Sequence, residues 1–136
     1  MVDVHTREQR TYNMAQIRSR DTKPELVLRK ELFALGFRYR LHVPGLPGTP
    51  DLVFPGRQKV VFVNGCFWHS HSCKYGRVQP ATRHDYWASK RSETVARDAR
   101  KQMALEVMGW RVLTVWECEL RALDQAIFKV TEFLDS

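Results

Sequence analysis

Two strand-like runs with a long helical pattern between them constrain this chain more than any other feature. Lys59–Val63 and Trp110–Trp116 are short and β-rich, and Asp85–Met108 carries small or apolar residues at helical spacings. A unit of this length is typical of a βαβ crossover, in which both strands run the same way. Cys66 and Cys118, which follow the two strands, should then meet at the carboxyl edge of the sheet, where sites usually form.

The preceding segments predict one helix and two more strands. Thr22, an early proline and Glu25 are typical of a helix start, and Gly36 ends the helix. Its inner stripe should be Leu28, Leu32 and Leu35. Apolar and polar residues alternate over residues 37–42, which predicts a strand. Asp51–Phe54 should pair with the following strand as a hairpin, because turn residues separate the two.

A last amphipathic helix, about Glu119 to Leu134, completes a small single α/β domain with a mixed central sheet flanked by helices. The 136 residues suffice for one hydrophobic core. No apolar run approaches the roughly 18 residues of a membrane span, and no signal segment follows Met1. We therefore expect a soluble, cytoplasmic protein that does not bind membranes.

The formal net charge is +7, and the excess of cations lies in the first hundred residues. Fifteen of the 22 cationic side chains are arginine, whose planar guanidinium suits phosphates and base edges. A polyanionic partner is one interpretation, and a solvated basic surface is the other.

Cysteine and histidine gather in one irregular segment. Cys66, His69, His71 and Cys73 lie within eight residues, and Cys118 should join them from the parallel strand. Zinc prefers four such ligands and could hold a loop that has no core of its own. Either histidine could complete the three cysteines; the alternative is a set of unrelated thiols and surface histidines.

Asp51 follows a proline at the start of a predicted strand, where its carboxylate could hold Mg²⁺. A turn aspartate is the simpler interpretation of this residue alone. Restriction-type nucleases add a second carboxylate and a lysine on the next strand, but that strand reads Phe62-Val63-Asn64.

Large aromatic residues flank the histidine segment as the pairs Phe67-Trp68 and Tyr86-Trp87. They could stack between DNA bases or could cover the core beside zinc. On the long helix one face should carry Trp87, Arg91, Thr94 and Asp98, and so an aromatic ring, a cation and an acid together. An ordinary solvated helix face is the alternative interpretation.

Together these residues resemble the very-short-patch mismatch repair endonucleases, enzymes that nick DNA at T:G mismatches. The similarity covers most of the chain, and its most specific motifs are Gly65-Cys-Phe-Trp-His69 and Val115-Trp-Glu-Cys118. Further matching positions are Asn13-Met14, Arg20-Asp21-Thr22, Glu25, Pro47-Gly48, Pro50-Asp51, His71, Cys73, Pro80 to Arg83, Trp87, Arg97-Asp98 and Gly109 to Val112.

The resemblance implies roles for the candidate residues. Structural zinc would be bound by Cys66, His71, Cys73 and Cys118. His69 would then be free to act as the catalytic base, with Asp98 orienting its imidazole. Catalytic Mg²⁺ would be held by the Asp51 carboxylate and the Val63 main-chain carbonyl, and Glu25 would hydrogen-bond metal-bound water.

The resemblance also implies a restriction-endonuclease-like fold and a mode of DNA binding. Residues 1–20 would form a basic arm that contacts the minor groove, and residues 21–136 would form the endonuclease domain. The side chains expected at or in the base stack are Met14, Phe67, Trp68 and Trp87. The expected protein is a monomer that nicks 5′ to the thymine of a T:G mismatch in double-stranded DNA, with mismatch-repair accessory proteins as further candidate partners.

Two positions depart from the family pattern: Asn64 replaces a histidine, and Thr94 replaces an asparagine. Asn64 can donate a hydrogen bond but cannot take up a proton, so a scheme with two histidines does not fit this chain. The rival interpretations are a catalytically silent zinc-held DNA-binding module and a restriction-type nuclease of other specificity.

Overall fold

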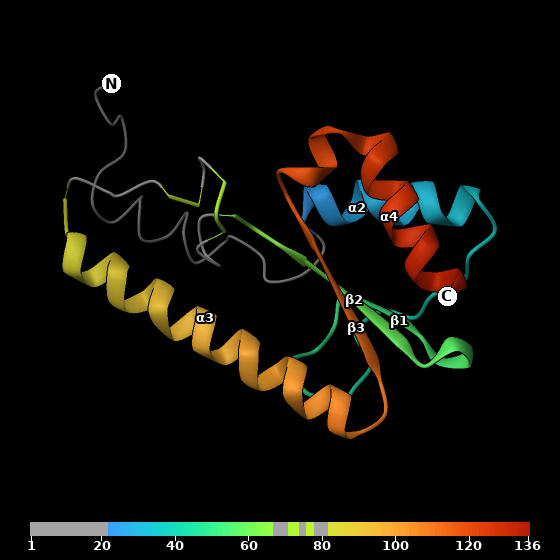
Figure 1. The fold of residues 1–136 in the computed structure, drawn as a ribbon, viewed down its shortest axis with the longest axis horizontal. Helices are drawn as coiled ribbons and strands as arrows, with labels where there is room; N and C mark the ends of the chain where they lie inside the picture. Colours follow the sequence, from blue (N-terminus) through green and yellow to red (C-terminus); the bar gives the residue numbers. More distant parts are fainter. Residues whose placement is uncertain (1–21, 67–70, 74–75, 78–81) are drawn as a thin grey trace.

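The computed structural model describes residues 22–66, 71–73, 76–77 and 82–136. Its elements, shown in Figure 1, are α2 (Lys23–Ala34), β1 (Leu52–Phe54), β2 (Lys59–Asn64), α3 (His84–Val107), β3 (Arg111–Trp116) and α4 (Leu123–Asp135). Short 3-10 turns occupy Pro55–Arg57 and Glu119–Arg121.

The three strands form one mixed sheet in the order β1-β2-β3. β1 and β2 are an antiparallel hairpin, with Val53 opposite Val60. β2 and β3 are parallel, and their last paired residues are Asn64 and Trp116. This arrangement confirms the predicted mixed sheet and the parallel crossover through α3.

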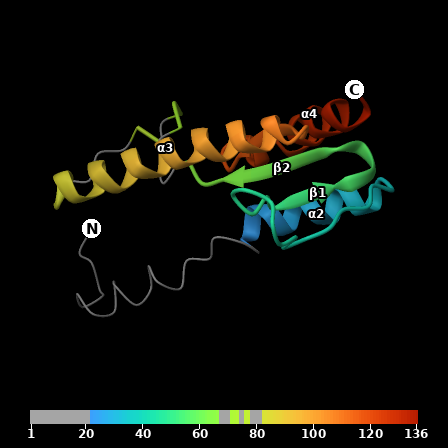
Figure 2. The ribbon, with the colours of Figure 1, turned by 90° about the horizontal axis from the view of Figure 1, so that it is seen from below.

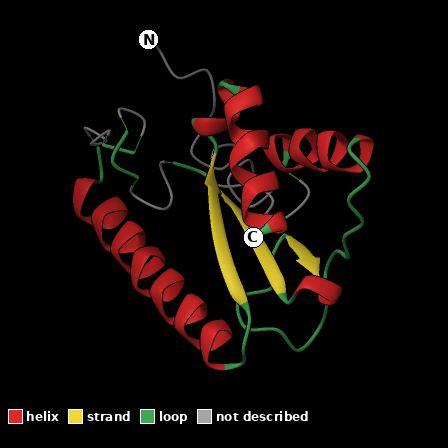
Figure 3. Cartoon of the chain, turned by 45° about the vertical axis from the view of Figure 1, so that its right-hand side comes forward, coloured by secondary structure: helices red, strands yellow, loops and turns green. Residues whose placement is uncertain are grey.

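Helices cover both faces of the sheet (Figures 1 and 3). On one face α2 and α4 pack against a core of Leu28, Leu32, Leu52, Phe54, Val61, Val115, Val130 and Leu134. On the other face Leu105 of α3 packs against Val53 and Val60. Figure 2 shows α2 and α3 on opposite sides of the sheet. The alternation of side chains along β1 and β2 supplies both cores, as the pleat of a strand requires.

Two cations of the hairpin hold the C-terminal end of α4. Arg57 donates to the Leu134 carbonyl at 2.8 Å, and the buried Lys59 ammonium donates to the Leu134 and Ser136 carbonyls at 3.0 and 2.6 Å. Burial, with the nearby Arg111 and Arg57, lowers the pKa of Lys59. These bonds satisfy carbonyls that a helix end leaves without intrahelical partners.

The first helix begins as predicted, but its inner stripe is shorter. The Thr22 hydroxyl accepts a bond from the Glu25 amide at 3.4 Å. Leu28 and Leu32 are fully buried, whereas Leu35 is 57% exposed and was wrongly predicted to face inward. The helix ends at Ala34, so Leu35 no longer follows its periodicity.

Other boundaries also differ from the prediction. The expected strand over residues 37–42 is reduced to one bridge between Arg40 and Val53, and β1, which carries Val53, is itself only three residues long. Phe37, Tyr39 and Leu41 still pack against the core. The predicted last helix is divided by Ala122, which leaves a 3-10 turn before α4.

The long helix α3 lies at its predicted position, but its apolar residues do not mark the buried face. Val95, Met103 and Val107 are exposed. The least exposed positions include Trp87, Arg91, Thr94, Asp98 and Leu105, so the predicted polar face is the one turned toward the protein.

Among the described residues, none of the helices combines the length and the apolar character that a membrane span requires.

Leu32 should contribute far more to stability than Leu35, although both are leucines near the end of α2. Leu32→Ala removes a fully buried side chain from the core and should lower the free energy of unfolding by about 2–5 kcal/mol. Leu35→Ala, as the matched control, should change it by less than about 0.5 kcal/mol. Chemical denaturation measures both; equal effects would contradict the described end of α2.

Candidate metal centre and carboxylate edge

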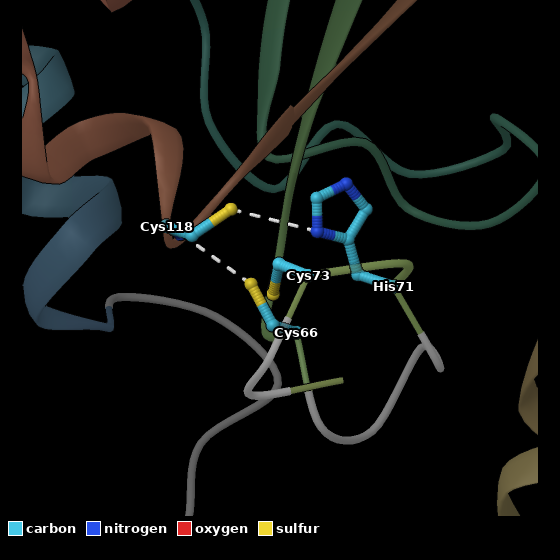
Figure 4. A group of neighbouring side chains, drawn as sticks. All are labelled: Cys66, His71, Cys73 and Cys118. Carbon is cyan, nitrogen blue, oxygen red and sulfur yellow. Dashed lines mark hydrogen bonds between the residues drawn. The ribbon is translucent and has the colours of Figure 1, made fainter. Parts of the chain in front are cut away.

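Four potential metal ligands converge beyond the carboxyl ends of β2 and β3. One donor atom from each of Cys66, His71, Cys73 and Cys118 lies within 4.8 Å of the other three (Figure 4). We call this group the Cys/His cluster. Cys118 Sγ lies 3.5 Å from His71 Nδ1, and the Cys118 amide donates to Cys66 Sγ at 3.4 Å.

The parallel pairing explains why residues 52 positions apart meet here. Beyond the last strand pair, the Glu117 amide donates to the Asn64 carbonyl at 2.9 Å. This bond continues the ladder by one step. Cys66 and Cys118 therefore leave the sheet side by side.

Contacts within the loop and with β3 orient the remaining two ligands. The His71 amide donates to the Cys66 carbonyl at 3.0 Å, and the His71 ring stacks on Trp116 with centroids 4.1 Å apart. The Arg77 amide donates to the Cys73 carbonyl at 3.0 Å. Gly76 lies so close to His71 that a Cβ there would overlap the His71 main chain. Only glycine fits that position.

The donor set and its electrostatics fit zinc. Three sulfurs and one imidazole nitrogen are donors that tetrahedral zinc sites use. Burial raises the pKa of Cys66 to about 12 and also raises the pKa of Cys118. Burial thus favours the neutral thiols, and a zinc ion bound here would compensate the charge of the thiolates that serve as its ligands. The cluster is consistent with a structural zinc site.

A second polar group lies at the same edge, on the hairpin side. Asp51 immediately precedes β1 and is 9% exposed. Its Oδ2 accepts a hydrogen bond from the Val63 amide at 2.7 Å. The two residues predicted to hold Mg²⁺ are thus in direct contact.

The family of this chain can be assigned from its sequence relatives. The sequence profile described as DNA mismatch endonuclease Vsr matches residues 2–75. The type II nicking enzyme V.XorIIP of Xanthomonas oryzae is 48% identical over 135 residues, covering 99% of this chain and 98% of that protein. The chain belongs to the Vsr family of DNA mismatch endonucleases.

Other Vsr-family relatives align over nearly the same length. The DNA mismatch endonuclease Vsr of Escherichia coli is 43% identical, over 92% of this chain and 80% of that protein. The type II nicking enzyme V.NmeAIP of Neisseria meningitidis is 42% identical, over 89% of this chain and 86% of that protein. Membership of the Vsr family makes this chain a DNA endonuclease, and its partner is DNA.

Four of the other predicted site residues lie in the described part of the chain. Glu25 is buried in the first turn of α2, where it forms an ion pair with Arg29. Asn64 is 9% exposed at the end of β2, next to Val63. Asp98 lies on the inward face of α3. At the start of that helix the half-buried Trp87 ring packs edge-on against Tyr86 at 5.1 Å.

The remaining candidates, Met14, Phe67, Trp68 and His69, lie outside the described residues. Their predicted roles stay predictions. Of the two histidines that could complete the three cysteines, His71 lies in the Cys/His cluster, and His69 is one of the residues that the structure does not describe.

Several supporting residues carry no sequence signal. Glu119 accepts from the Trp116 amide at 3.0 Å and pairs with Lys129 of α4 at 2.8 Å, which fixes the turn around Cys118. The stacking of Trp116 on His71 and the buried position of Gly76 also escaped prediction. Each depends on a contact in the folded structure that no local sequence pattern encodes.

Removing one cysteine should release the metal and the loop together. We expect one zinc ion per wild-type chain, and Cys118→Ser should lose most of it and melt at a lower temperature, because an incomplete site binds zinc weakly. Ser72→Ala, a change at an exposed position between His71 and Cys73, is the control and should keep its zinc. Elemental analysis and thermal unfolding measure these effects; folded wild-type protein without zinc would contradict the assignment.

Proposed function

We propose that this Vsr-family protein is a Mg²⁺-dependent endonuclease that nicks one DNA strand 5′ to the thymine of a T:G mismatch. Such a nick would begin very-short-patch repair of deaminated 5-methylcytosine. The observation that carries the proposal is the contact between Asp51 and Val63 beside the Cys/His cluster. The T:G preference itself rests on the resemblance and on the aromatic residues of the sequence.

The strand geometry makes Asp51 and Val63 a fitting pair for Mg²⁺. Successive residues of a strand direct their main-chain groups alternately to the two neighbouring strands. The Asn64 carbonyl accepts from Glu117 on the β3 side, so the Val63 amide and carbonyl face the β1 side, where Asp51 lies. A carboxylate and a carbonyl oxygen are donors that Mg²⁺ prefers. When bound, the metal would lower the pKa of its water and neutralise charge on the phosphate.

The chain's own side chains would position the reacting groups. His69 lies two residues from His71, so zinc at the cluster would restrict where its imidazole can reach. In the proposal His69 removes a proton from the attacking water, and Asp98 orients the ring. The buried Glu25 would hold a water by hydrogen bonding, and Asn64 would donate a hydrogen bond without exchanging a proton.

Aromatic wedging would supply the preference for mismatched DNA. We assign Phe67, Trp68 and Trp87 to the base stack and Met14 to the basic arm of residues 1–20, with residues 21–136 as the endonuclease domain acting as a monomer. Opening a base step costs about a few kcal/mol and costs less where pairing is already imperfect. A wedge of this kind would therefore favour T:G over paired T:A duplexes.

The charge of Asp51, rather than its shape, should be required for cleavage. Asp51→Asn keeps an oxygen that can accept from the Val63 amide but removes the charge that attracts Mg²⁺. It should lower the single-turnover nicking rate by at least about 10³-fold and leave duplex binding within a few-fold of wild type. Asp124→Asn, the same change at an exposed position of α4, is the control. Undiminished nicking by Asp51→Asn would refute the metal role.

A panel of duplexes separates this proposal from its two rivals. Wild-type protein should nick one strand of T:G duplexes faster than matched T:A duplexes of the same context. Trp68→Ala should reduce that ratio by about ten-fold, because the unstacking contact contributes about 1–3 kcal/mol per base. Binding without any cleavage would indicate a silent DNA-binding module. Equal cutting of both strands of matched DNA would indicate a restriction-type nuclease.

A further inference from the structure

A buried arginine on α3 has no part in the proposed chemistry. Arg91 and Leu105 are the two buried residues of this 24-residue helix. Leu105 belongs to the core against the sheet, whereas Arg91 is a charged side chain only 6% exposed. Burying a guanidinium is unfavourable unless hydrogen bonds compensate for the lost water. The hydrogen bonds of Arg91 therefore indicate why a cation is buried at this position.

The Arg91 guanidinium donates through Nη2 to the main-chain carbonyl of Gly76. Gly76 is buried and lies against the main chain of His71, a member of the Cys/His cluster. We call residues 71–73 and 76–77 the ligand loop. Arg91 thus joins α3 to the ligand loop directly behind one of its metal ligands.

The same face of α3 carries the residues assigned to DNA and to His69. Trp87 lies one helical turn before Arg91, and Asp98 lies two turns after it. A helix is stiff over this length, so fixing α3 at Arg91, between Trp87 and Asp98, sets the position of both residues relative to the cluster. Displacement of a catalytic or binding group by about 1 Å can cost about 10²-fold in rate.

We propose that Arg91 is a positioning residue: its bond to Gly76 fixes α3 against the ligand loop, so that the metal centre sets where Trp87 and Asp98 meet the substrate. The expected effect on nicking rests on the proposed function. The link between Arg91 and the ligand loop is independent of that function, and zinc release measures it without DNA.

The test compares three variants of the zinc-loaded full chain. Arg91→Met removes the donor but keeps an unbranched apolar stem, and Arg91→Lys keeps a buried cation of shorter reach. Arg100→Met removes the same charge from an exposed position of the same helix and is the matched control. The readouts are the rate of zinc release to an excess of chelator, the dissociation constant for a T:G duplex, the single-turnover nicking rate at saturating DNA and the melting temperature.

We expect Arg91→Met to release zinc about ten-fold faster than Arg100→Met and to nick about 10- to 100-fold more slowly, with DNA affinity within a few-fold of that control. Arg91→Lys should show smaller changes in both the zinc-release rate and the nicking rate. If Arg91→Met does not fold, Arg91→Lys decides: zinc release and nicking both equal to Arg100→Met would overturn the proposal.

Two further outcomes are distinguishable. A lower melting temperature with unchanged zinc release and unchanged nicking by the folded fraction would make Arg91 a purely structural residue and overturn the proposal. If wild-type protein nicks no duplex, the proposed function fails, whereas faster zinc release by Arg91→Met would still support the contact with the ligand loop.

Discussion

The parallel pairing of β2 with β3 is the interaction on which the rest of the described structure depends. It aligns Asn64 with Trp116, and the Glu117 amide then bonds to the Asn64 carbonyl one step further. Without this register, Cys66 and Cys118 would not meet, and Trp116 would not lie beneath the His71 ring. A shift by one residue would turn every side chain of β3 to the opposite face, so the two cores and the Cys/His cluster specify the same register.

The two ends of the sheet are stabilised by different means. At the end near the hairpin turn, Arg57 and Lys59 bind carbonyls of α4. Past the carboxyl ends of β2 and β3, the Cys/His cluster and main-chain hydrogen bonds connect the described segments. A small domain has limited apolar surface to bury, so metal ligation is an effective means of ordering a loop without enlarging the core.

The sequence predicted those parts of the fold in which a local signal agrees with the tertiary structure. The hydroxyl of Thr22 caps α2, the crossover joins β2 to β3, and the cysteines after the strands form one cluster. The buried face of α3 could not be predicted from apolar spacing, because Arg91 is one of its two buried residues, whereas Val95, Met103 and Val107 are exposed. Leu35 fits the helical period but follows the helix end, which depends on how Gly36 turns the chain. The contact of Asp51 with Val63 requires the hairpin register and has no signature in either residue alone.

The hydrogen bond from Val63 to Asp51 has a consequence for how this site can change over evolutionary time. The donor is a main-chain amide, so every residue except proline supplies it at position 63. The side chain of Val63 packs against the core, so its volume is constrained. The orientation of the Asp51 carboxylate does not depend on which side chain occupies position 63. Sequence drift at position 63 can therefore alter stability without misaligning Asp51, whereas at position 51 the hydrogen bond depends on the side chain itself.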